Sequence, residues 1–188
     1  MRQIKIGILG EIRAGKDTVA QLFAHEIKKV SKSRIQFLAF STGIHDVIGL
    51  TMPELYDDGK PREALQHIGQ SLRQLKPDVW IDYLFNSNAY KWSELSGENI
   101  FVTDVRQPNE ALRLQEQGFK IIKVTASEDV RIQRAIANGD NFTPEMFNHE
   151  TEKAIQLCTY DYLIDNSYSI DVLEETVRGI IEEVISNG

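Results

Sequence analysis

The stretch Ile4-Lys-Ile-Gly-Ile-Leu-Gly10-Glu-Ile-Arg-Ala-Gly15-Lys16-Asp17-Thr18 decides how this chain folds. An apolar run rich in β-branched residues leads into the spacing Gly-x-x-x-x-Gly-Lys, and a helical pattern follows directly. Glycines let the backbone point successive N–H groups at an anion, and a helix N-terminus favours negative charge at the same place. The motif therefore predicts a cradle for a nucleoside triphosphate, with Lys16 on the β- and γ-phosphates. The predicted nucleotide-binding residues are Gly10, Arg13, Ala14, Gly15, Lys16, Asp17 and Thr18.

Asp17 stands where such loops usually carry the Ser or Thr that holds Mg²⁺, and Thr18 follows one residue later. The Asp17 carboxylate can contact the metal through water, or it can accept N–H groups at the start of the helix. A residue without a hydroxyl followed by Thr resembles the nucleoside monophosphate kinases more than the GTPases.

Length and composition indicate one globular domain over residues 1–188, with 41% apolar and 26% charged residues. No apolar stretch approaches the length of a membrane span. Cys158 is the only cysteine, which excludes a disulfide framework and a cysteine-based zinc site. The net charge of −7 argues against non-specific binding to nucleic acid. The first residues run straight into the first predicted strand without room for a signal peptide, so we expect a cytoplasmic protein.

Strands and helices alternate along the chain. Strands are predicted at 4–9, 35–40, 99–105, 119–125 and 162–165. Helices are predicted at 16–31, at 61–88 with a break at Pro77, and at 108–117, 128–137, 143–158 and 170–185. The alternation predicts an α/β fold of three layers: a five-stranded parallel sheet with helices on both faces, the fold of P-loop NTPases.

Ligands of such sheets bind at the carboxyl ends of the strands, so we expect the glycine loop, Ser41, Asp104 and Arg106 to converge on one cleft. Asp104 ends a buried strand and is expected either to orient Mg²⁺ or to cap a helix. Arg73 and Arg106 are candidate clamps for a phosphate, because guanidinium groups bind phosphate oxygens in pairs. The alternative for each is a solvated surface charge.

Arg131 and Arg134 lie three residues apart and share one helix face. Two arginines before a glycine-containing loop suit a lid that neutralises charge on a transferring phosphoryl group. They would otherwise be surface residues paired with Glu128 and Asp129. Trp80 is expected to pack in the core, or to line a pocket for a nucleobase.

Four blocks of the chain resemble the deoxynucleoside monophosphate kinases of phages and their bacterial relatives. They are Gly10–Thr18; Leu65-Gln-His-Ile-Gly69-Gln-Ser-Leu-Arg73 with Pro77-Asp78-Val-Trp80; Val102-Thr-Asp104-Val-Arg106-Gln-Pro108-Asn109-Glu110-Ala; and His149-Glu-Thr151-Glu152 with Tyr162-Leu-Ile-Asp165-Asn166. Together they span nearly the whole chain in the order of that family.

The resemblance implies transfer of the γ-phosphoryl group of ATP, with Mg²⁺, to the 5′-phosphate of a (deoxy)nucleoside monophosphate, giving the diphosphate and ADP. It assigns Lys16 to the ATP phosphates and Arg131 and Arg134 to a short helical lid at about 127–148. The metal would be arranged by Asp17, Thr18 and Asp104, and the acceptor would be held by Arg73, Arg106, Asn109, Glu110 and Trp80. By this resemblance the core covers about 1–60 and 99–188, and an acceptor-binding helical insertion covers about 61–98.

Three alternatives to this function remain at the level of sequence. The first is a kinase of the same chemistry with another acceptor, such as dephospho-coenzyme A or phosphomevalonate. The second is a metabolite kinase with a sugar or shikimate-like acceptor. A nucleotide-binding sensor without transfer activity would keep the glycine loop, but it would have no use for four arginines around an acceptor. The segment Ser41–Asp46 departs from the acidic and apolar pattern expected beside the acceptor. The expected partner is a small nucleotide, and the chain could also form a homodimer.

Overall fold

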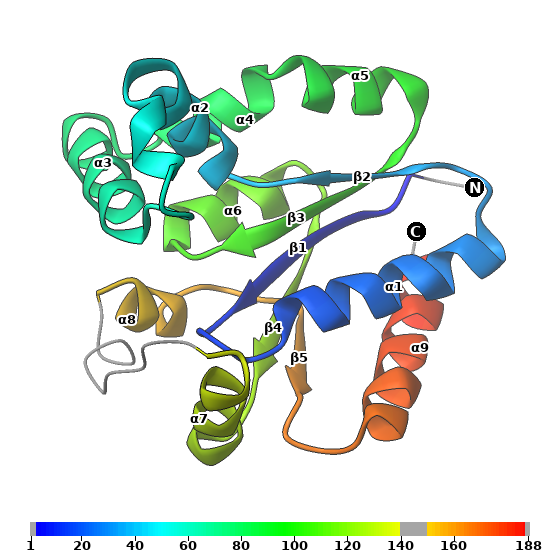
Figure 1. The fold of residues 1–188 in the computed structure, drawn as a ribbon. Helices are drawn as coiled ribbons and strands as arrows, with labels where there is room; N and C mark the ends of the chain where they lie inside the picture. Colours follow the sequence, from blue (N-terminus) through cyan, green and yellow to red (C-terminus); the bar gives the residue numbers. More distant parts are fainter. Residues whose placement is uncertain (1–2, 140–149, 187–188) are drawn as a thin grey trace.

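The computed structural model describes residues 3–139 and 150–186 of the chain. Five parallel strands form one sheet in the order β2-β3-β1-β4-β5 (Figure 1). Their bounds are β1 Lys5–Gly10, β2 Ile35–Leu38, β3 Asn99–Val105, β4 Lys120–Thr125 and β5 Tyr162–Asp165. The predicted five-stranded parallel sheet is confirmed.

Helices cover both faces of this sheet. One face carries α1 (Lys16–Val30) and α9 (Ile170–Ser186). The helices between β2 and β3 are α2 Ser41–Thr51, the 3₁₀ turn η1 Pro53–Tyr56, α3 Arg62–Leu75, α4 Val79–Asn86 and α5 Asn88–Ser96. The later helices are α6 Pro108–Glu116, α7 Glu128–Ala137 and α8 Glu150–Gln156.

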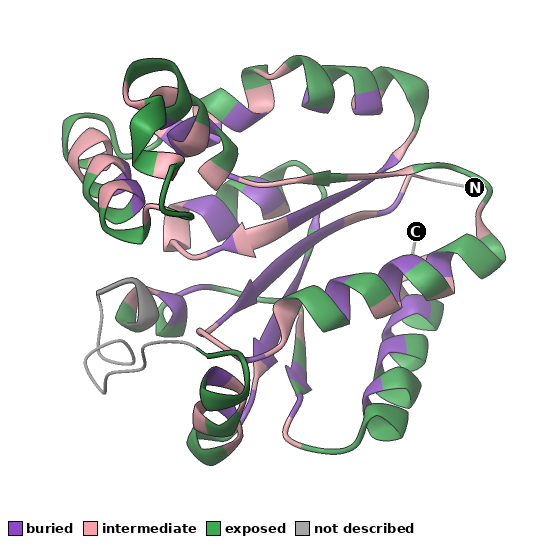
Figure 2. Ribbon diagram, in the orientation of Figure 1, coloured by how far each residue is buried: buried purple, intermediate pink, exposed green. Residues whose placement is uncertain are grey.

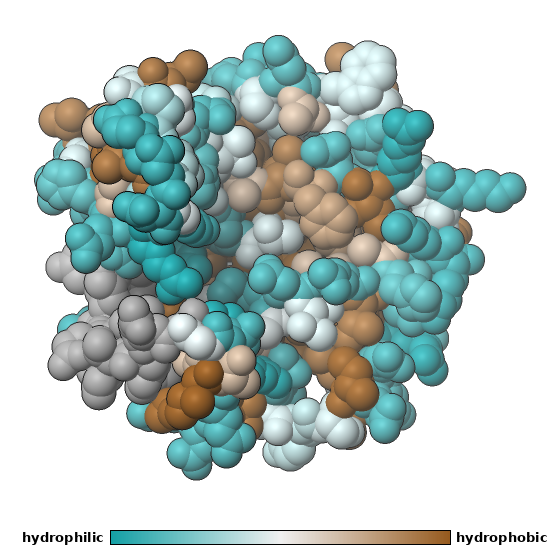
Figure 3. Space-filling view, viewed as in Figure 1, coloured by the Kyte–Doolittle hydropathy of each residue, from teal (hydrophilic) through white to brown (hydrophobic). Residues whose placement is uncertain are grey.

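The central strands β1, β3 and β4 are mostly buried, because helices cover both faces of the sheet and successive side chains point to opposite faces (Figure 2). Ile6 and Ile8 of β1 pack into the core under α1 and α9, whereas Leu9 belongs to the second core with residues of α2 to α6. Figure 3 shows hydrophilic residues over most of the outer surface in that view, with apolar residues in smaller groups. In the described part of the chain, no helix is both long and apolar enough to span a membrane.

The helix α2 was not predicted, because its own residues carry no N-cap signal. Its N-cap residue, Phe40, offers no side chain that accepts a hydrogen bond. The Asp104 carboxylate at the end of β3 instead accepts the backbone N–H groups of Phe40 and Ser41, at 2.8 and 2.9 Å. A cap supplied from 64 residues away leaves no local pattern.

The other differences are small. The predicted break at Pro77 is confirmed, because α3 ends at Leu75 and α4 begins at Val79. The sequence analysis also missed α5, although Ser87 caps its N-terminus and Gly97 ends it with a φ of 68°. Of the helix expected at 143–158, α8 is described. Residues 140–149 lie outside the described part, which leaves out His149 and residues 140–148 of the predicted lid.

Candidate active site

The glycine loop leads from β1 into α1, as its sequence predicts. Gly15 is the N-cap of α1 with a φ of 91°, a left-handed conformation that favours glycine. Gly15 has no side chain to cap this helix end, which suits the end to an anion. The Lys16 ammonium donates to the carbonyl oxygen of Glu11 at 3.0 Å and so folds back over the loop.

A cavity of about 470 Å³ lies beside this loop. Residues Arg13 and Gly15 to Thr18 line one side of it, and Arg134, Asn138, Asn166 and Tyr168 line the other. All the predicted nucleotide-binding residues from Gly15 to Thr18, with Arg13, therefore face one space. Asp17 and Thr18 are exposed there, in the first turn of α1.

Asn166, after β5, holds the loop in place, a role that the sequence analysis did not assign. Its side-chain amide donates to the carbonyl oxygen of Ala14 at 2.9 Å, and the side chain is buried. A Cβ atom on Gly15 would lie 2.2 Å from this amide nitrogen. The loop therefore fits against Asn166 only with glycine at position 15. The only hint in the sequence of this role was that Asn166 directly follows the strand predicted at 162–165.

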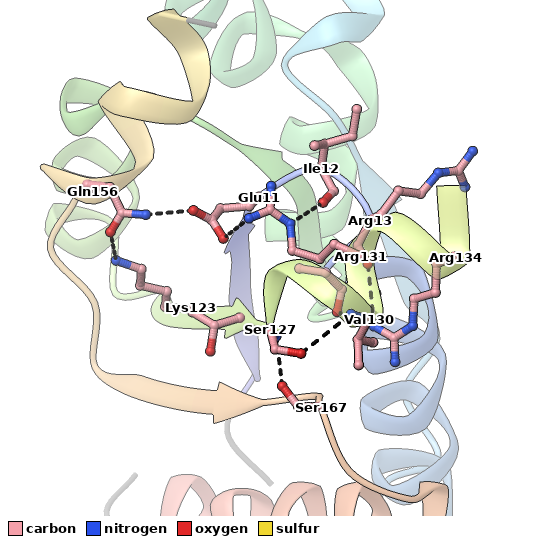
Figure 4. A network of polar contacts seen from close by, with 12 residues as sticks. Glu11, Ile12, Arg13, Lys123, Ser127, Val130, Arg131, Arg134, Gln156 and Ser167 are labelled. Atoms are coloured by element: carbon pink, nitrogen blue, oxygen red, sulfur yellow. Dashed lines mark hydrogen bonds and ion pairs between the residues drawn. The ribbon is translucent and has the colours of Figure 1, made fainter. Parts of the chain in front are cut away.

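Arg131 and Arg134 of α7 both reach the glycine loop (Figure 4). Arg131 donates through Nε to the carbonyl oxygen of Ile12 at 2.9 Å. Arg134 donates to the carbonyl oxygens of Ala14 at 3.3 Å and Asn166 at 2.9 Å. The predicted shared face is present, and it is directed at the glycine loop. The carboxylate that pairs with Arg131 belongs to Glu11 of the loop, at 2.6 Å.

Asp104 and Arg106 lie at the end of β3, next to the loop, because Leu9 of β1 is in register with Val105 of β3. Asp104 also contacts the backbone of Ser41, so Ser41, Asp104 and Arg106 lie at the same end of the sheet as the glycine loop. None of these three residues lines the cavity beside the loop, so their convergence on one cleft stays a prediction. Asp104 has the capping role that the sequence offered as one alternative, with both carboxylate oxygens on the N-terminus of α2. Its role toward a metal stays a prediction.

Glu110 is the centre of a second polar group. It is 2% exposed and accepts from Arg73 Nη2 at 3.0 Å, from the Arg106 backbone N–H at 2.9 Å and from the Gln107 backbone N–H at 3.0 Å. Burial raises the pKa of Glu110 to about 7, against the opposing effects of the Arg73 charge and the Arg106 N–H. Glu110 therefore brings Arg73 of α3 to the turn that carries Arg106.

Besides the buried Glu110, two more of the predicted acceptor residues make contacts within the protein. Trp80 is 2% exposed and donates through its indole N–H to the carbonyl oxygen of Gly69 at 3.1 Å. This is the packing role that the sequence offered as its alternative to a base pocket. Asn109 donates to Asp78 Oδ1 at 2.7 Å and to the carbonyl oxygen of Pro77 at 3.3 Å, which joins α6 to the turn before α4.

The residues beside the cavity fit a magnesium–nucleotide complex. Mg²⁺ prefers oxygen ligands and is usually held by one or two protein groups together with substrate phosphates and water. Asp17 and Thr18 offer a carboxylate and a hydroxyl at the mouth of the loop. Residues 3–139 and 150–186 contain no group of three or more His, Cys, Asp or Glu side chains that could hold a metal ion without a substrate.

Comparison with known proteins gives matches among solved structures. No protein-family model matches the chain, and no curated protein matches it. Shikimate kinase from Acinetobacter baumannii, in complex with shikimate, is 16% identical with a TM-score of 0.54, over 98% of this chain and 94% of that one. A gluconokinase from Sinorhizobium meliloti 1021 is 14% identical with a TM-score of 0.54, over 100% and 97%. TT1252 from Thermus thermophilus is 18% identical with a TM-score of 0.55, over 97% and 98%. The chain therefore has the five-stranded parallel α/β fold of the P-loop kinases.

Proposed function

We propose that this protein transfers the γ-phosphoryl group of ATP to the 5′-phosphate of a (deoxy)nucleoside monophosphate. The observation that carries the proposal is the cluster around Glu110, which gathers Arg73 and the Arg106 turn at the edge of the sheet beside the glycine loop. Guanidinium groups bind phosphate oxygens in pairs of hydrogen bonds, so Arg73 and Arg106 would suit an acceptor that already bears a phosphate.

The donor side supports ATP as the second substrate. The N-terminus of α1 and Lys16 offer hydrogen bonds and positive charge to the phosphates. The cavity beside the loop is large enough for a nucleoside, and the exposed ring of Tyr168 on its wall can stack on a base.

In this proposal the bound Mg²⁺–ATP supplies the activated phosphoryl group, and the chain supplies position and charge. Lys16 holds the β- and γ-phosphates, and Asp17, Thr18 and Asp104 orient the metal and its waters. Arg73 and Arg106 hold the acceptor phosphate, with Glu110 positioning Arg73. Arg131 and Arg134 place positive charge at the loop, where charge develops during transfer.

Other acceptors define the second candidate. The structures named shikimate kinase and gluconokinase share the fold, so a hydroxyl acceptor is compatible with the same phosphate loop. Dephospho-coenzyme A and phosphomevalonate bear phosphates, and they would use the same two arginines. A sensor without transfer activity would bind ATP and need neither arginine.

The test is an ADP-release assay with Mg²⁺–ATP and a panel of acceptors. The panel contains dAMP, dGMP, dCMP, dTMP, hydroxymethyl-dCMP, the four ribonucleotides, dephospho-coenzyme A, phosphomevalonate, shikimate and gluconate. Turnover with a nucleoside monophosphate above the rate without acceptor is the expected result. Turnover with another compound alone would refute the acceptor, and ATP binding without any turnover would favour the sensor.

Arg106→Ala tests the acceptor side separately. We expect loss of at least 10²-fold in kcat/KM for the acceptor, with Mg²⁺–ATP affinity changed less than about twofold, because the change removes a charge-assisted contact to the acceptor only. Arg113→Ala is the matched control, since Arg113 is an exposed arginine on α6 whose ion-pair partner is Glu116. Equal effects of both variants would contradict the assignment.

A further inference from the structure

The glycine loop contains a carboxylate, Glu11, directly after Gly10. One of its oxygens accepts from Arg131 Nη1 at 2.6 Å, and the other accepts from the Gln156 side-chain amide at 2.7 Å (Figure 4). The Gln156 oxygen in turn accepts from the Lys123 ammonium at 3.3 Å. Glu11 thus joins the loop to α7 and α8, which lie 120 and 145 residues further along the chain.

A negative charge in a loop that binds phosphates opposes its own ligand. The contacts around Glu11 reduce this repulsion, because the carboxylate pairs with Arg131 and is linked through Gln156 to Lys123, and both cations are 7% exposed. The three residues together carry a formal charge of +1. The Glu11 carboxylate therefore weakens the attraction of the loop for phosphate only a little, as long as its contacts with Arg131 and Gln156 are kept.

The same contacts fix the direction of the Arg131 guanidinium. Its Nε donates to the Ile12 carbonyl oxygen at 2.9 Å, while its Nη1 donates to the Glu11 carboxylate. Two contacts at different atoms of a planar group determine both its place and its rotation. The Ile12 contact by itself would let the guanidinium turn about its Nε–H, and the Glu11 contact opposes this rotation.

We propose that Glu11 is a positioning residue, which orients Arg131 at the phosphate loop and couples α7 and α8 to it. The inference rests on the proposed function, in which Arg131 acts on the transferring phosphoryl group. Glu11 acts through Arg131 and makes no contact with the substrates. Its effect therefore depends on the presence of Arg131.

A double-mutant cycle tests this dependence. Glu11→Ala is expected to lower kcat at least tenfold and to leave KM for the acceptor within twofold. In the Arg131→Ala background the same change is expected to lower kcat less than twofold. Glu11→Gln, which keeps an acceptor for Arg131 but loses the charge, is expected to lie between wild type and Glu11→Ala, and it replaces Glu11→Ala if that variant does not fold.

Two controls complete the experiment. Glu128→Gln removes one negative charge from an exposed position of α7 and is expected to keep the wild-type kcat. Mg²⁺–ATP affinity is measured for the four proteins of the cycle. We expect Glu11→Ala to weaken this affinity at least fivefold when Arg131 is present, and to leave it unchanged in the Arg131→Ala background. If wild type binds ATP and transfers to no acceptor, the proposed function fails while the affinity cycle still tests the coupling. Equal fold losses in both backgrounds, or an unchanged Glu11→Ala enzyme, would overturn the inference.

Discussion

Replacing Glu110 with Gln changes how the stability of this protein depends on pH. Glu110 is 2% exposed, and burial raises its pKa from 4.5 to about 7 although Arg73 and two backbone N–H groups favour its charged form. A carboxyl group whose pKa is raised on folding binds its proton more tightly in the folded state. Its stabilising contribution is complete below pH 4.5, and it is lost as the pH rises through about 7.

The size of this effect follows from the two pKa values. One pKa unit corresponds to roughly 1.4 kcal/mol, so the shift from 4.5 to about 7 corresponds to about 3 kcal/mol in total. Between pH 5 and pH 8 the Glu110 contribution to the free energy of unfolding should fall by about 2–3 kcal/mol. Glutamine does not titrate, so Glu110→Gln should gain this amount relative to wild type over the same interval.

The assay is urea unfolding of wild type and Glu110→Gln at pH 5, 6, 7 and 8, followed by circular dichroism. The difference between the two free energies of unfolding removes the contribution of all other titrating groups. Glu175→Gln, at an exposed position of α9, is the control and should keep the wild-type pH dependence. If the difference between wild type and Glu110→Gln is constant across the series, the carboxyl group titrates alike in both states, and the reasoning from burial is refuted.

Two substitutions and the reactivity of Cys158 give three further predictions. Asn166→Ala should destabilise the fold by about 1–2 kcal/mol and raise KM for ATP, because the Ala14 carbonyl oxygen loses a buried donor; an unchanged KM would contradict its role at the loop. Gly43→Ala should cost about 1–3 kcal/mol in urea unfolding, since the added Cβ would lie 2.8 Å from the Tyr83 ring, and wild-type stability would show that the ring moves aside freely. Burial raises the pKa of the Cys158 thiol to about 11, so its reaction with a disulfide reagent at pH 8 should be at least tenfold slower in the native than in the urea-unfolded protein; equal rates would refute its burial.

Local pattern was enough for most of the elements. The predicted strand at 99–105 and the predicted helix at 128–137 have the bounds of β3 and α7. Each has a signal within its own residues: a continuous apolar run for the strand, and a Ser127 cap with a 3.6-residue period for the helix. The helix α2 has no such signal, since its cap comes from Asp104 on another strand.

The sequence by itself determined the glycine loop and the start of α1, because the turn and the helix start need only residues 10–18 in that order. It also determined that Asp104 and Arg106 lie beside this loop, since parallel strands place their carboxyl ends on one edge. Only the tertiary structure decided which distant side chains contact the glycine loop. Glu11 meets Gln156 across 145 positions, and Asn166 meets Ala14 across 152, so no spacing in the sequence encodes either contact. The hydrogen bonds form because the sheet order sets β1 beside β4, and β4 beside β5, which brings distant ends of the chain to one loop.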